Sequence, residues 1–125
     1  MSDPATVSLL ERLVSTLSVV QFACNTEAEL QRGIAQVLSS AGFDAEREVA
    51  LGSHANRIDF RIGGAGGVGI EVKVGGSLVA VTRQLHRYLP YLSALVLVTT
   101  LHRHHGIPRL MCGKTVVVIN VGRWL

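Results

Sequence analysis

The chain has 125 residues, enough for one compact domain with a modest core but too few for a separate substrate domain. Hydrophobic residues make up 48% of the chain and charged residues 17%, a composition that excludes intrinsic disorder. The formal charge of +3 is compatible with binding a polyanion, but it is far below the charge density of an architectural DNA-binding protein.

Cysteine usage and the apolar runs bear on the cellular compartment. Cys24 and Cys112 stand alone, so neither a zinc ribbon nor a disulfide framework is indicated, and a reducing compartment is expected. The N-terminal segment lacks a basic leader and is interrupted by Glu11 and Arg12, so it does not read as a signal peptide. No apolar run has the length of a membrane span. We therefore expect a cytoplasmic protein without a membrane partner.

Two helices are predicted before any strand. Apolar residues recur at helical spacing from Thr6 to Val20, and Asp3-Pro4 just upstream suits a helix start. A second helix begins at Thr26, where Thr26-Glu27-Ala28-Glu29 matches a capping box, and Gly42 ends it. Its buried stripe is expected to consist of Leu30, Ile34, Leu38 and Ala41.

After Phe43 the apolar spacing changes to that of strands. Short strands are expected at 45–51, 57–62 and 68–74, and the glycine-rich turn 63–67 joins the last two. A third helix follows from Ser77, with Pro90 near its end.

Two buried strands are expected at 94–99 and 116–121, separated by a polar connection. That connection contains His102, His104 and His105, whose spacing fits no helix-borne metal site, so we interpret it as a solvated loop. The element order is α, α, β, β, β, α, β, β, which predicts a single domain of the α/β class.

The hairpin around the glycine-rich turn has a geometry that follows from the sequence. If 63–67 is the turn, Ile62 faces Val68, the register continues along both strands, and Asp59 lies opposite Glu71. Alternation then puts Asp59, Glu71 and Lys73 together on one face. The opposite, core face is expected to carry Ile58, Phe60, Ile62, Val68, Ile70, Val72 and Val74.

Two carboxylates directly across an antiparallel pair repel each other unless a cation lies between them. Oxygen ligands at this spacing suit Mg²⁺ or Mn²⁺, which can polarise a phosphoryl oxygen and lower the pKa of a bound water. Lys73, on the same face, could orient the attacking water or stabilise the charge that develops on the phosphorus centre. These residue types point to phosphodiester hydrolysis.

At these residues the chain resembles the PD-(D/E)XK nuclease superfamily, whose signature here is Asp59 followed by Glu71-Val72-Lys73. Ile58 stands where the motif often has proline. The resemblance implies a restriction-endonuclease-like αβββαβ core, with a mixed central sheet flanked by helices and an extra N-terminal helix. It divides the single domain into an N-terminal helical extension (1–24), a catalytic core (25–100) and a C-terminal loop and strand (101–125).

A second motif strengthens the resemblance. Gln84 and Tyr88, one helical turn apart, look like the Gln-x-x-x-Tyr motif of RecB-like members, in which the glutamine lies beside the catalytic lysine. The family also commonly supplies an acidic residue from the helix before the meander. Glu27 is favoured for this role, and Glu29, the capping-box partner, is the alternative.

The resemblance implies a full set of site residues. The catalytic group would comprise Asp59, Glu71, Lys73, Glu27 and Gln84. A Mg²⁺ or Mn²⁺ ion would be held by Asp59, Glu71, the backbone carbonyl of Val72 and Glu27. Because they flank these positions, we also expect nucleic acid to be contacted by Arg57, Arg61, Arg83 and Arg87, together with Tyr88.

The expected function is therefore a metal-dependent deoxyribonuclease, acting on DNA rather than RNA, in repair, recombination, restriction or phage DNA processing. The alternative is a catalytically silent nuclease-fold module that binds nucleic acid or a protein partner. A homodimer through the N-terminal helix is a further expectation.

Overall fold

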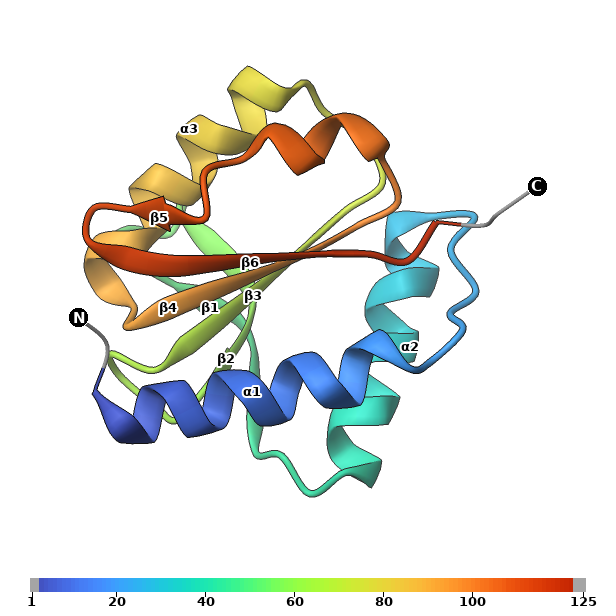
Figure 1. The fold of residues 1–125 in the computed structure, drawn as a ribbon, viewed down its shortest axis with the longest axis horizontal. Helices are drawn as coiled ribbons and strands as arrows, with labels where there is room; N and C mark the ends of the chain where they lie inside the picture. Colours follow the sequence, from blue (N-terminus) through green and yellow to red (C-terminus); the bar gives the residue numbers. More distant parts are fainter. Residues whose placement is uncertain (1–2, 123–125) are drawn as a thin grey trace.

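A six-stranded mixed sheet organises the chain, and the computed structural model describes residues 3–122. The strand order is β1-β2-β3-β4-β6-β5 (Figure 1). The first three strands form an antiparallel meander, β4 is parallel to β3, β6 is parallel to β4, and β5 is antiparallel to β6. The strands are β1 (Ala45–Ala50), β2 (Arg57–Ile62), β3 (Val68–Lys73), β4 (Ala94–Thr99), β5 (Leu110–Met111) and β6 (Lys114–Asn120).

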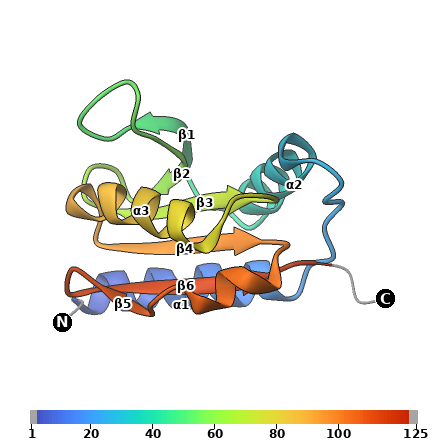
Figure 2. The ribbon, with the colours of Figure 1, turned by 90° about the horizontal axis from the view of Figure 1, so that it is seen from above.

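Helices cover both faces of this sheet. One core cluster joins residues of α1 (Pro4–Ser18) and α2 (Glu27–Ser40) to one face, and a second joins α3 (Leu78–Tyr88) to the other. The short 3₁₀ helices η1 (Leu89–Tyr91) and η2 (His102–Gly106) lie next to α3 (Figure 2). The α/β class is therefore confirmed. Within residues 3–122, no helix is both long and apolar enough to cross a membrane.

The helix starts expected from the sequence are present. Asp3 caps α1 by accepting a hydrogen bond from the Thr6 N–H at 3.0 Å. Thr26 caps α2 by accepting from the Glu29 N–H at 3.1 Å, and the Glu29 carboxylate accepts from the Asn25 N–H at 2.9 Å. The predicted capping box is therefore present, and the Glu29 carboxylate is used in it.

The N-terminal helix is part of the core. Leu10, Leu13 and Leu17 of α1 are buried in the same cluster as Leu30 and Ile34 of α2. The apolar side of α1 is therefore covered by the protein's own sheet and by α2, and its outward side is mostly polar. The expected homodimer through this helix remains a prediction. The extreme ends of the predicted ranges, residues 1–2 and 123–125, lie outside the described residues.

The predicted hairpin register holds at the turn end and stops at the site. Ile62 pairs with Val68 and Phe60 with Ile70, but the described ladder contains no pair beyond Phe60 on β2. The prediction for Ile58 is wrong, because its side chain packs in the α3 cluster while Phe60 packs in the α1–α2 cluster. The alternation of faces along β2 is therefore broken between these residues, and Glu48 on the neighbouring strand β1 has a positive φ of 54°.

The interpretation of 102–105 as a solvated loop is also wrong in part. These residues belong to η2, and His104 is completely buried. Its Nδ1 lies 2.5 Å from the Thr99 hydroxyl, and its Nε2 lies 2.9 Å from the Gly76 carbonyl oxygen. His104 therefore holds the loop after β3 against the end of β4, while His102 and His105 are exposed.

Candidate active site

Asp59 and Glu71 meet where β2 and β3 separate. The Asp59 Oδ2 atom accepts a hydrogen bond from the Val72 N–H at 2.8 Å, and the Asp59 N–H donates to the Glu71 Oε1 atom at 3.2 Å. Each carboxylate therefore takes the place of a ladder carbonyl on the facing strand. The two acidic groups come together as predicted, but through bonds from side chain to backbone.

Glu71 is a buried acid with one cationic neighbour. It is 3% exposed, and its Oε2 atom lies 3.2 Å from the Lys73 Nζ atom. Burial and the nearby Asp59 carboxylate raise the pKa of Glu71 from its ordinary 4.5 to about 8, although Lys73 opposes the shift. One lysine thus leaves the negative charge of this pair only partly compensated.

The N-terminal turn of α2 supplies the other polar groups. The Gln31 Nε2 atom donates to the Asp59 Oδ1 atom at 3.1 Å and contacts the Glu27 Oε2 atom at 3.5 Å. Burial raises the pKa of Asp59, and the negative charge of Glu27 adds to this, against the opposing effect of the Val72 N–H. Of the two candidate glutamates, Glu27 is the one next to Asp59.

Gln31 was missed from the sequence. A glutamine on a helix surface carries little signal alone, but its position one turn after Glu27 would have put both side chains on the same face.

Gln84 and Tyr88 of α3 bound the site from the other side. The Gln84 Nε2 atom donates to the Tyr88 hydroxyl oxygen at 2.8 Å, and the Tyr88 hydroxyl donates to the Arg57 carbonyl at 2.6 Å. The same hydroxyl oxygen lies 3.5 Å from the Glu71 Oε2 atom. Burial and the negative charge of Glu71 raise the pKa of Tyr88, which keeps its hydroxyl protonated.

The expected contact between Tyr88 and nucleic acid is not supported by this arrangement. Tyr88 is 1% exposed and packs in the α3 cluster. Its hydroxyl instead ties α3 to β2 beside the carboxylates.

An open groove gives access to this cluster. It has a volume of about 460 Å³ and runs between the start of α2 and the face of α3. Lys73, whose side chain is 19% exposed, reaches it together with Glu27, Gln84 and Arg87. Gly75 and Gly76 form part of its wall, and open space surrounds the position where a Gly75 Cβ would lie. The backbone here leaves room for a bulky substrate.

The arginines expected at the site fall into two groups. Arg87 lines the groove, Arg83 is exposed on α3, and Arg57 is exposed at the start of β2. Arg61 instead lies away from the groove, where its Nε and Nη2 atoms each lie 2.9 Å from an oxygen of Glu46. This bidentate pair occupies the guanidinium group, so the structure does not bring Arg61 to the site.

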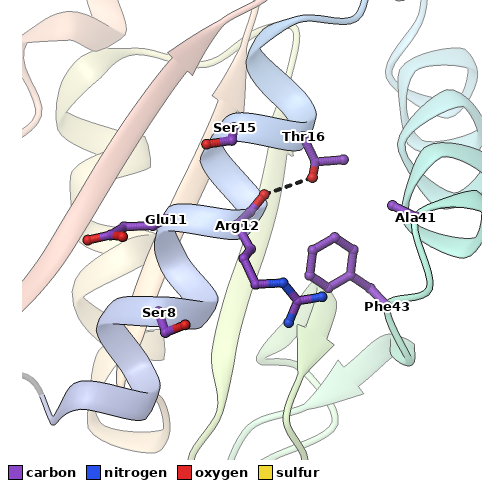
Figure 3. A pocket seen from close by; sticks show the side chains of 7 residues that line it. All are labelled: Ser8, Glu11, Arg12, Ser15, Thr16, Ala41 and Phe43. Atoms are coloured by element: carbon purple, nitrogen blue, oxygen red, sulfur yellow. Dashed lines mark hydrogen bonds between the residues drawn. The ribbon is translucent and has the colours of Figure 1, made fainter.

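Two further hollows lie on the α1–α2 side. In one, the Arg12 guanidinium stacks over the Phe43 ring, 4.7 Å from its centroid, between polar side chains of α1 (Figure 3). The second is bordered by Arg12 and Phe43 again and by the Arg61–Glu46 pair. Neither contains a cluster of acidic side chains like that at Asp59.

The donor atoms at the strand separation fit a hard divalent cation. Asp59 and Glu71 offer carboxylate oxygens. The Val72 N–H donates to Asp59, and because the N–H and C=O of one strand residue point to the same side, the Val72 carbonyl is expected on this side too. Among residues 3–122, no hydrogen-bond partner of these carboxylates is a cysteine or histidine, and an all-oxygen donor set suits Mg²⁺ or Mn²⁺. Within residues 3–122, however, no three His, Cys, Asp or Glu side chains are already grouped around one metal position.

Known proteins give no further guide. Comparison with protein-family models, curated proteins and solved structures finds no match to this chain.

Proposed function

We propose that this chain is a metal-dependent deoxyribonuclease of the PD-(D/E)XK type. One observation carries the proposal: Asp59, Glu71 and Lys73, expected from the sequence to form a site, lie in one hydrogen-bonded cluster beside an open groove. The order from α2 to β4, with a helix, a three-stranded meander, a helix and a parallel strand, supports the nuclease core.

The electrostatics of the cluster support the same proposal. A buried acid such as Glu71, with a pKa of about 8, destabilises the folded state at neutral pH, and such groups are concentrated at functional sites. Asp59 and Glu71 would hold the divalent cation, together with the Val72 carbonyl. When bound, such an ion polarises a phosphoryl oxygen and lowers the pKa of water.

The remaining residues have roles that follow from their contacts. Lys73 reaches the groove next to Glu71, where its ammonium group would stabilise negative charge on a phosphate being cleaved. Gln31 holds the free oxygen of Asp59, which fixes the direction of that carboxylate. Gln84 is oriented by Tyr88 and presents its amide at the groove wall. Glu27, on the opposite wall, would act through a water molecule or an added cation.

The decisive experiment is cleavage of labelled single-stranded, duplex and branched DNA in Mg²⁺, Mn²⁺ or EDTA. Wild type is expected to cut in metal and not in EDTA, whereas Lys73→Ala and Asp59→Asn lose at least about a hundredfold in rate. Arg12→Gln, which changes one charge far from the groove, is the control and keeps its activity. If Lys73→Ala cuts as fast as wild type in clean preparations, the assignment is wrong.

A second candidate is a nuclease-fold module that binds without cutting. It is favoured by the absence, in residues 3–122, of three acidic or histidine side chains already grouped for a metal. DNA binding without cleavage in any of the metals would support this candidate over the first.

A further inference from the structure

Charge is divided along the chain at Glu71. All nine Asp and Glu residues lie at or before this position, together with five Lys and Arg, so this part has a net charge of −4. The chain after Glu71 has seven Lys and Arg and no acidic residue, a net charge of +7. The modest overall charge of +3 therefore hides two strongly different parts.

The fold gathers part of the basic half on one side. Segment 102–114 runs along the whole of α3: Arg103 donates to the Gly76 carbonyl just before the helix, and Lys114 donates to the Leu89 carbonyl just after it. α3 and η2 lie on the same side of the sheet in Figure 1, with the edge strand β5 beside them, and they face the viewer in Figure 2. We name the four exposed arginines of this side, Arg83, Arg87, Arg103 and Arg109, the basic face.

The positive charges of the basic face are not neutralised by the protein. In the part of the chain that the structure describes, the ion pairs are Arg61 with Glu46 and Lys73 with Glu71. Arg103 and Arg109 donate to backbone carbonyls, which fix the position of each guanidinium without cancelling its charge. Fixed, unpaired arginines suit phosphate groups, because their planar donors match phosphate oxygens.

Within the described residues, the basic face has few of the features that bind single strands. Proteins that hold single-stranded nucleic acid combine positive charge with exposed aromatic rings on which bases stack. Tyr88 is buried, and among residues 3–122 the one large exposed aromatic side chain beside α3 is Tyr91 of η1, so a row of stacking rings is absent there. The exposed side of α3 and η2 carries arginines and histidines. Contacts of this kind address the sugar–phosphate backbone of a duplex and carry no sequence readout.

We propose that duplex nucleic acid lies across α3 and η2, with Arg109, and Arg103 next to the groove wall at Gly76, binding phosphates other than the one in the groove. Arg87 belongs both to the groove and to the basic face, so a single duplex would pass from one to the other. That the bound polyanion is nucleic acid rests on the proposed function. The location of the binding face rests on the charges alone.

The test is binding of a fluorescein-labelled 30-base-pair duplex in EDTA, where cleavage cannot occur, over a range of salt concentrations. Arg109→Gln and Arg83→Gln are each expected to weaken binding about five- to tenfold at 0.1 M salt and to lower the slope of log K against log salt by about 1. Arg12→Gln removes the same charge on the α1 side and should bind like wild type. Arg103→Gln should follow Arg109→Gln, and a circular dichroism spectrum checks that each variant is folded.

Two results would overturn the inference: Arg109→Gln and Arg83→Gln binding the duplex like Arg12→Gln, or a single strand of equal length binding as tightly as the duplex. Binding to phosphatidylserine vesicles but not to DNA would also overturn it and assign the face to an anionic membrane. Failure of the proposed function is a separate result. If Arg109→Gln loses DNA binding while wild type cleaves DNA in none of the metals, the basic face binds nucleic acid but the proposed nuclease activity is wrong.

Discussion

Replacing Glu71 by glutamine should raise the free energy of unfolding of the metal-free protein. The same change should abolish cleavage when metal is present. Folded Glu71 has a pKa of about 8 against an ordinary 4.5, so the folded state keeps this proton to a higher pH than the unfolded state does. The contribution of this proton to the free energy of unfolding is fully present below about pH 4.5, and it is lost as the pH rises toward 8. At about 1.4 kcal/mol per pKa unit, the loss is at most about 5 kcal/mol.

Glutamine has no charge to bury, so the variant escapes this loss. The pKa of about 8 already includes the attraction of Lys73, and at pH 8 about half of the folded molecules still carry the proton. The expected net gain at pH 8 is therefore about 2 to 4 kcal/mol, or roughly 5 to 15 °C in Tm for a domain of this size. At pH 4.5 to 5 the two proteins should unfold at nearly the same temperature.

The assay is thermal unfolding of wild type and Glu71→Gln in EDTA at several pH values from 5 to 8.5, followed by circular dichroism. Glu11→Gln, on the outward side of α1 (Figure 3), controls for the loss of an acidic residue at the surface. Adding Mn²⁺ at pH 8 should raise the Tm of wild type but not that of Glu71→Gln. Parallel curves of Tm against pH for wild type and Glu71→Gln would refute the electrostatic argument.

Three further predictions concern the site contacts of Tyr88 and Gln31 and the packing at Gly69. Tyr88→Phe leaves the Arg57 carbonyl without its donor and frees the Gln84 side chain. It should lower the free energy of unfolding in urea by about 1 to 3 kcal/mol and reduce cleavage. An unchanged urea midpoint would contradict this. Gln31→Leu releases one oxygen of Asp59, and we expect a cleavage rate at least about tenfold lower with a stability change under about 1 kcal/mol, measured on the same preparation. Gly69→Ala would push a methyl group into Ile58 and Leu92 and should destabilise the fold by about 1 to 3 kcal/mol, with partial recovery in Gly69→Ala/Ile58→Val.

Much of the fold could be predicted because its signals are local. Capping residues such as Asp3 and Thr26 act within one helical turn, and the glycine-rich turn sets the pairing of Phe60 with Ile70 three residues away on each strand. Alternation along β3 was enough to put Glu71 and Lys73 on the same side. The acidic cluster therefore followed from spacing.

What escaped prediction depends on distant parts of the chain. Ile58 leaves its expected face where the alternation along β2 is broken, and Gly69 leaves space for its side chain next to Leu92. His104 is buried because Thr99 and Gly76, brought close by the sheet, satisfy both of its ring nitrogens. These contacts join residues far apart in the sequence, so no local pattern predicts them. From the sequence alone, His104 cannot be told apart from the exposed histidines beside it.

The carboxylates at the strand separation have a consequence for the motion of the sheet. The amide hydrogens of Val72 and Asp59 end on side-chain oxygens rather than on carbonyls of the opposite strand. A side chain can swing toward an arriving cation without moving a strand, and it then leaves its amide open to solvent. The exchange rates of these two amides with deuterium, relative to those of the ladder residues Phe60 and Ile70, would thus report from inside the sheet on whether the site is loaded.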